Sequence, residues 1–241
     1  MSTLFRYELR RLVLNKIFIA LLIITVVYAW MILTGETILG AGYTAPYSDW
    51  SFGAYLASVM PMAMLTVLLL MSGYYSKKEK RVEILLEVTP MRSSSRALLR
   101  IAAITVCFGI VCGAAFGTAA WFYMSVFGRF ADFLGPSVTV ILPCYVFTLG
   151  LGFNAGRVHP AALYALMPLL FGLGSLNLGG FDLFGGGFFE SRPVTLEAVA
   201  NSDPAFDVGA IFIAARVLYF AAGGLLLAAG ILSKKRIGIK A

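Results

Sequence analysis

Long runs of apolar residues with very few charges dominate this sequence and restrict what it can fold into. Six such runs cover approximately residues 17–33, 51–73, 97–127, 136–154, 161–176 and 204–232. A helix needs about 20 residues to cross the ~30 Å hydrocarbon core of a bilayer. Only 13% of the residues are charged, against roughly 25% in soluble domains. The sequence therefore predicts an all-α integral membrane protein with six transmembrane helices.

Basic residues collect in every second loop. All but three of the 19 Lys and Arg residues lie in the N-terminal flank, in residues 74–100, at Arg157 and in the C-terminal tail. The intervening loops carry Arg129 and Arg192 beside eight carboxylates: Glu36, Asp49, Asp132, Asp182, Glu190, Glu197, Asp203 and Asp207. Loops rich in Lys and Arg stay in the cytoplasm. Both termini and residues 74–100 are therefore predicted to be cytoplasmic, and segment 177–203 extracytoplasmic.

Residues 1–16 precede the six-span domain, which covers residues 17–241. As a helix, residues 1–16 would have one apolar side and one basic side. On a helix, one side would be apolar: Phe5, Leu9, Leu12 and Val13. Three arginines lie off that side: Arg6, Arg10 and Arg11. This pattern is typical of an amphipathic helix at the membrane interface. The alternative is a basic flank that only orients the first span.

Residues 74–100 are the one long charged island of the chain. The pattern from Glu79 to Val88 is helical, with an apolar stripe made of Val82, Leu85 and Leu86. A second face carries a row of carboxylates: Glu79, Glu83 and Glu87. Like charges at this spacing repel each other, so a solvated helix gains nothing from the row. Either the row and the apolar stripe both meet a partner, or the segment is a stable interfacial helix with solvated acids. Pro90 ends the helix.

Three glycines at helical spacing lie in the third apolar run. Gly109, Gly113 and Gly117 share one helix face, and such a face lets another helix approach closely in lipid. The spacing indicates either ordinary packing inside the chain or an interface with another subunit.

Arg216 is the single basic residue inside the sixth run, whose start is predicted at Asp203 and Pro204. It lies ~27 Å along the helix from Lys234, close to the outer edge of the hydrocarbon core. It either reaches the outer surface or pairs with an acid of the preceding loop. The alternative is a role in a transport path.

No catalytic motif is present in the sequence. It contains one histidine, no Gly-Lys dipeptide of a phosphate-binding loop and no metal-ligand spacing. Cys107, Cys112 and Cys144 lie in apolar runs and are predicted to pack as small hydrophobic residues. We expect a chain that is not itself an enzyme and that holds no cofactor or metal of its own.

The run Lys80-Arg-Val-Glu83-Ile-Leu-Leu86-Glu-Val-Thr-Pro90-Met-Arg-Ser-Ser-Ser-Arg96 resembles the cytoplasmic loop of ATP-binding-cassette (ABC) type-2 transporter permeases. The layout is also similar to that family: an amphipathic entry helix, six spans, a charged loop between the second and third spans, and a re-entrant outer segment before the sixth. Residues 179–190 occupy the place of that segment, although their glycines argue against a regular helix.

The resemblance implies a permease subunit of an ABC exporter in the cell membrane, in particular a bacterial inner membrane. Its partners would be a second permease copy or paralogue, and two cytoplasmic ATPase subunits that bind ATP and Mg. A coupling helix would enter a cleft of the ATPase; the matching positions are Glu79, Glu83, Leu85, Leu86, Glu87 and Pro90. The apolar spans favour a hydrophobic or amphipathic substrate such as a peptide, a lipid-like molecule or a drug. The alternative is a six-span scaffold or sensor subunit that docks a cytoplasmic protein without transporting a solute.

Overall fold

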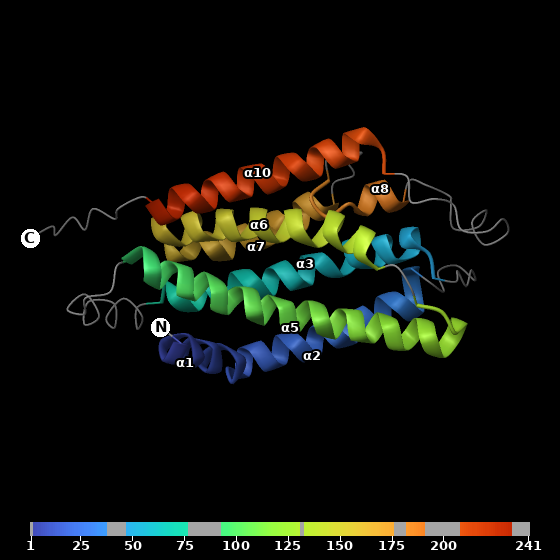
Figure 1. The fold of residues 1–241 in the computed structure, drawn as a ribbon, viewed down its shortest axis with the longest axis horizontal. Helices are drawn as coiled ribbons and strands as arrows, with labels where there is room; N and C mark the ends of the chain where they lie inside the picture. The colour runs from blue at the N-terminus through green and yellow to red at the C-terminus, as the bar shows by residue number, and fades with distance from the viewer. Residues whose placement is uncertain are drawn as a thin grey trace, which may run out of the picture.

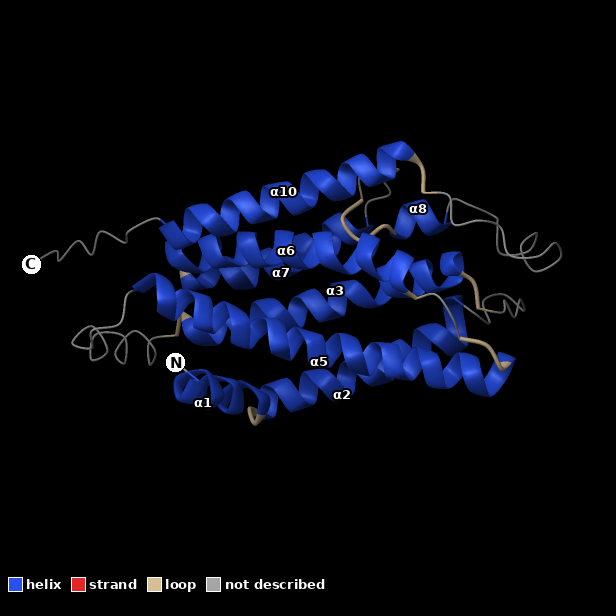
Figure 2. Ribbon diagram, viewed as in Figure 1, coloured by secondary structure: helices blue, strands red, loops and turns tan. Residues whose placement is uncertain are grey.

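The computed structural model of the chain describes residues 2–37, 47–76, 93–130, 133–175, 182–190 and 208–232. Its elements are α1 (Ser2–Val13), α2 (Lys16–Ile32), the π-helical turn η1 (Leu33–Thr37), α3 (Asp49–Tyr74), α5 (Ser93–Phe127), α6 (Leu134–Val158), α7 (Pro160–Ser175), α8 (Gly186–Glu190) and α10 (Ala210–Leu232). Every element in these ranges is helical (Figure 2). The predicted all-α class is confirmed for the described part of the chain.

The long helices lie side by side and run alternately between the two ends of one bundle (Figure 1). Helix α3 is central and packs against α2, α5, α6 and α7, whereas α10 packs mainly on α6. We call one end the α1 end; it holds α1, Tyr74, Ser93, His159 and Leu232. The opposite end, which holds η1, the start of α3, α8 and the start of α10, is the α8 end.

Five helices are long and apolar enough to cross a membrane. These stretches are Lys16–Gly35, Asp49–Tyr74, Ser95–Phe127, Leu134–Val158 and Ala210–Leu232. The sixth, α7, has 16 residues and a length of ~24 Å, which is less than the ~30 Å of a hydrocarbon core. The chain thus has the helices of a membrane protein, and the fifth predicted span, residues 161–176, is present as a helix too short to cross the core at full thickness.

Helix α10 begins later than the sequence suggests. Val208 and Gly209 are not helical, and the Gly209 carbonyl accepts hydrogen bonds from the amides of Phe212 and Ile213. Gly209 therefore caps the helix, since the residue before the first helical turn accepts its first backbone bonds. The predicted start at Asp203 and Pro204 is wrong for this helix; both residues lie outside the described ranges.

Helix α1 is amphipathic, as its sequence indicates, and its apolar side faces the bundle. Leu12 is buried, Phe5 and Leu9 pack against the core, and Arg6 and Arg10 are exposed. The helix lies against α5. Its position at a membrane interface stays a prediction.

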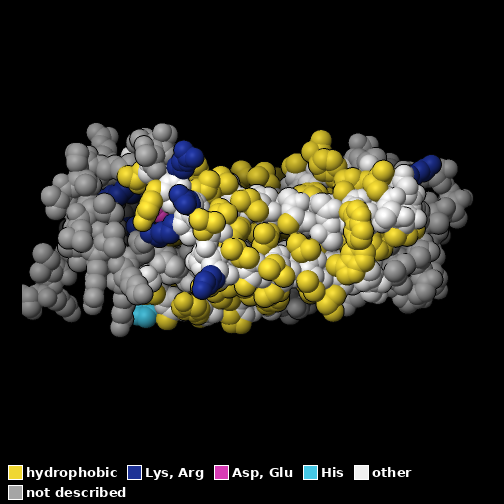
Figure 3. All heavy atoms as spheres, turned by 90° about the horizontal axis from the view of Figure 1, so that it is seen from below, with side chains coloured by type: hydrophobic (Ala, Val, Ile, Leu, Met, Phe, Trp, Pro, Cys, Tyr) yellow, Lys and Arg dark blue, Asp and Glu magenta, His cyan; other side chains and the backbone are white. Residues whose placement is uncertain are grey.

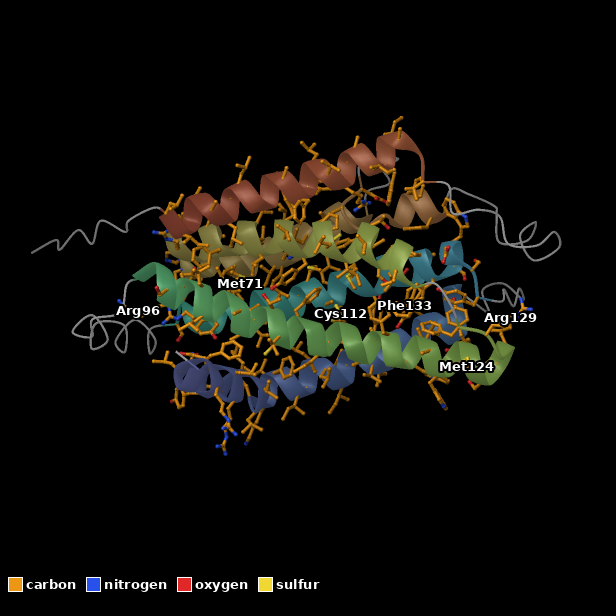
Figure 4. The ribbon with its side chains drawn as sticks, in the orientation of Figure 1. Met71, Arg96, Cys112, Met124, Arg129 and Phe133 are labelled. Carbon is orange, nitrogen blue, oxygen red and sulfur yellow. The ribbon has the colours of Figure 1, made fainter. Side chains whose placement is uncertain are left out.

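The surface of the bundle separates charge from apolar side chains. Figure 3 shows a broad hydrophobic face, with most of its Lys and Arg side chains gathered toward the α1 end. Arg96 and Arg129 lie at opposite ends of α5 (Figure 4). The predicted alternation of basic and non-basic loops therefore corresponds to two opposite ends of the molecule.

Candidate functional site

Residues 182–190 depart from the pattern of long helices and fold into the α8 end of the bundle (Figure 1). Asp182, Leu183 and Phe184 are buried. Gly185 has φ +88°, a left-handed conformation that glycine adopts without steric cost. One short helix, α8, follows directly. The glycine-rich stretch thus forms an irregular entry and a single helical turn, and no longer helix in the described residues.

Arg216 holds this segment from α10. Its side chain is only 4% exposed, and its Nη2 lies 3.0 Å from Oδ1 of Asp182. Nη2 also donates to the Asp182 carbonyl at 2.8 Å, and Nη1 donates to the Leu183 carbonyl. Arg216 therefore pairs with an acid of the preceding segment, which is one of the two arrangements that its position in the sequence suggests.

The second oxygen of the Asp182 carboxylate is also bonded. Its Oδ2 accepts from the Gly187 amide in the first turn of α8 at 2.6 Å. A buried carboxylate is tolerated only when it is paired and hydrogen-bonded. Both oxygens meet this condition, so the ion pair and the short helix stabilise each other.

Cys144 adds a contact from α6. Its Sγ donates to the Leu183 carbonyl at 2.9 Å, and Arg216 Nη1 lies 3.9 Å from the same sulfur. The thiol is fully buried. Cys144 thus packs in a helix as predicted, and it also touches the polar cluster, a contact that its sequence neighbours do not indicate.

A group of aromatic rings from three helices adjoins the ion pair. The Arg216 guanidinium lies 4.2 Å from the centroid of the Phe212 ring, and that ring stacks on Phe188 at 4.0 Å. Trp50 of α3 contacts Phe188 at 5.6 Å and Phe189 at 6.0 Å between centroids. The ion pair is buried, and a low local dielectric strengthens it, although Nε of Arg216 has no hydrogen-bond partner among the described residues.

A second cluster lies at the α1 end, on both sides of the charged island. The guanidinium groups of Arg11 and Arg100 lie 5.3 Å and 5.2 Å from the centroid of the Tyr74 ring. Its hydroxyl donates to Glu8 at 3.4 Å, and Glu8 pairs with Arg11 at 3.7 Å. Tyr74 therefore joins the last residue of α3, the start of α5 and the amphipathic helix α1. We call this the Tyr74 cluster.

The predicted coupling residues of the island are not among the described residues. This applies to all six positions: Glu79, Glu83, Leu85, Leu86, Glu87 and Pro90. Their role stays a prediction, and the Tyr74 cluster is the described structure on either side of them.

The predicted glycine face on α5 is open in the described part of the chain. Gly109, Gly113 and Gly117 are exposed, and a Cβ at any of them would meet no atom within 4 Å. In the described residues, these three glycines therefore do not pack against another helix of this chain. A subunit interface on this face stays a prediction.

Close helix packing occurs instead between α6 and α10. A Cβ on Gly150 would lie 2.4 Å from the Gly223 carbonyl oxygen, and a Cβ on Gly223 would lie 2.5 Å from the Phe147 backbone. Asn154 donates to the Leu226 carbonyl at 2.7 Å. No GxxxG spacing marks Gly150 or Gly223 in the sequence, so this contact was not predicted.

Among the described residues, no group of three or more His, Cys, Asp or Glu side chains is placed to hold a metal ion.

Comparisons of the chain with protein-family models, with curated proteins and with solved structures found no match. The likeness to type-2 permeases thus depends on residues 80–96 and on the arrangement of the apolar segments.

Proposed function

We propose that this chain is the membrane-spanning permease subunit of an ABC exporter of the type-2 class. In this proposal the α1 end faces the cytoplasm of a bacterial cell, and the α8 end faces outward. Helix α7, with the inserted segment 182–190 beyond it, supplies the fifth of six crossings. ATP and Mg bind to two separate ATPase subunits, and a second permease copy or paralogue completes the complex.

The observation that carries the proposal is the Tyr74 cluster. A coupling helix is useful only if a force on it reaches the transmembrane helices. Tyr74 and Arg100 are the first and last residues of the island. The Tyr74 ring contacts Arg100 and also Arg11 of α1, and its hydroxyl donates to Glu8 of α1. Closure of ATPase subunits on the island would thus move α1, α3 and α5 together. A mobile loop between two independent helices would absorb the same force.

The substrate class follows from the apolar character of the spans. Charged side chains inside membrane helices are costly unless paired, and the Arg216–Asp182 pair is the one buried ion pair found in the described residues. A path lined mainly by apolar side chains favours a hydrophobic or amphipathic substrate such as a peptide, a lipid-like molecule or a drug. Arg216, at the α8 end, is a possible residue of this path.

The proposal is tested by changing the island in membranes that contain this chain and the ATPase encoded nearest to it. Glu83→Arg with Leu86→Asp removes one charge of the carboxylate row and one residue of the apolar stripe. We expect loss of the ATPase from the purified complex, or ATP turnover that substrate no longer stimulates. The matched control is Arg129→Glu with Leu134→Asp, which alters an exposed charge and an exposed leucine at the α8 end.

Unchanged recovery and turnover in the island variant would contradict the proposal. If the ATPase is recovered but substrates never stimulate turnover in the wild type, the chain would instead be a scaffold or sensor subunit that uses the same loop to hold a cytoplasmic protein.

A further inference from the structure

A buried ion pair holds residues 182–190 in the bundle, although an apolar contact could hold them equally well. Replacing a buried ion pair by apolar side chains of similar volume is often neutral or stabilising. The Arg216 guanidinium donates to Asp182 and Leu183 of this segment and to one sulfur of α6. Its bonds are thus directed at the segment, and stability alone does not account for the choice of a charged pair.

A charged pair differs from an apolar contact when it separates. Two apolar surfaces that part in water are penalised by the hydrophobic effect, whereas two separated charges are hydrated and regain much of their desolvation cost. An ion pair can therefore be firm when water is excluded and still open into a water-filled space. This property suits a contact that must break and re-form.

The segment bridges three helices at the α8 end. Phe189 fits against Gly53 of α3, where an added Cβ would lie 2.3 Å from its ring. Phe188 stacks on Phe212 of α10, and the Leu183 carbonyl accepts a hydrogen bond from the Cys144 thiol of α6. Gly185, in its left-handed conformation, joins the part held by Arg216 to helix α8. The segment thus closes this end of the bundle.

We propose that Arg216 and Asp182 form a latch that keeps residues 182–190 closed over α3, α6 and α10, and that separation of the two charges releases the segment. The role of this opening as the outward step of a transport cycle rests on the function proposed above. The latch itself is a property of this chain, and its first test needs no ATPase.

Cys144 reports whether the segment is closed, because its thiol is buried and bonded to the Leu183 carbonyl. The experiment uses the full chain in membrane vesicles with Cys107→Ala and Cys112→Ala, so that Cys144 is the single thiol. A membrane-impermeant maleimide is added, and the rate of labelling is compared among Asp182→Asn, Arg216→Met and the unaltered pair. The matched control is Arg157→Met, which removes an arginine that also bonds α10, at the Gly230 carbonyl near the α1 end.

We expect slow labelling for the intact pair and for Arg157→Met, and labelling about tenfold faster or more for Asp182→Asn and Arg216→Met, because labelling follows the open population. Equal rates in all four proteins would overturn the latch, since the aromatic contacts would then hold the segment by themselves.

A double variant keeps the test decisive if a single variant fails to fold. Asp182→Leu with Arg216→Met replaces the pair by apolar side chains, which a buried site tolerates. We expect its Cys144 to stay protected during ATP hydrolysis in the assembled complex, whereas that of the intact pair becomes labelled. Equal acceleration by ATP in both proteins would overturn the latch. Fast labelling of the single variants without any effect of ATP on the intact pair would support the latch and contradict the exporter.

Discussion

At the scale of single residues, glycines decide how closely two helices approach. Gly223 of α10 faces the backbone of α6 at Phe147, whereas its neighbour Gly224 has no atom within 4 Å of an added Cβ. A backbone neighbour cannot move aside as the end of a side chain can. One position therefore has no room for a side chain, and the next position is open.

We predict that Gly223→Val destabilises the protein, because the added methyl groups force α6 and α10 apart. Overpacking of a filled contact costs about 1–3 kcal/mol. The measurement is the midpoint of thermal unfolding of the purified protein in detergent. Gly224→Val is the control and should leave the midpoint close to that of the wild type. Equal midpoints for the two variants would show that this helix contact is looser than described.

At the scale of elements, the Tyr74 cluster explains how the short helix α1 is attached to the bundle. An isolated 12-residue helix is marginal in water, and α1 is held against α5 and the end of α3 by apolar side chains and by Tyr74. Each contact between a cation and a ring contributes about 0.5–1 kcal/mol at exposed sites. Tyr74 therefore determines how firmly α1 follows the other two helices.

We predict that Tyr74→Leu loosens α1 without unfolding the bundle, since leucine keeps apolar volume but loses the ring and the hydroxyl. Hydrogen exchange of the amides in residues 2–13 should become several-fold faster. Tyr164→Leu is the control, because Tyr164 is an exposed tyrosine on α7. Unchanged exchange in Tyr74→Leu would show that apolar packing alone fixes α1, and would weaken the proposed relay from the island.

At the scale of the whole molecule, successive long helices run in opposite directions between the two ends of the bundle, and this alternation defines the topology. Helix α7 is the weak point of the six-span arrangement, because it is shorter than a hydrocarbon core is thick. Arg129 precedes α6 in the chain, His159 is the C-terminal cap of α6, and Arg192 follows α8 in the sequence. These three positions test the orientation and the fifth crossing together.

We predict that single cysteines at these positions react from alternate sides of the membrane. In a background without native cysteines, Arg129→Cys and Arg192→Cys should react with an impermeant maleimide in intact cells, and His159→Cys only in inverted vesicles. The reason is the excess of Lys and Arg on the cytoplasmic side. Reaction of Arg192→Cys from the same side as His159→Cys would exclude a crossing by α7.

The sequence alone determined the class of the protein, the approximate limits of its long helices and the two-sided distribution of charge. These properties depend on local composition: apolar runs need lipid or protein around them, and 3.6-residue periodicity is visible at the level of single letters. The amphipathic side of α1, from Phe5 to Val13, was readable for the same reason. The burial of all three cysteines followed from their apolar neighbours.

Only the tertiary structure decided which residues meet. It placed Gly150 against Gly223, and it left Gly109, Gly113 and Gly117 open although their spacing is that of a helix-packing face. It selected Asp182 among the acids of the preceding loop as the partner of Arg216, and it brought Cys144 to the same cluster. These choices depend on how helices rotate and pair, and residues 34 or 72 positions apart leave no periodic trace of their contact in the sequence.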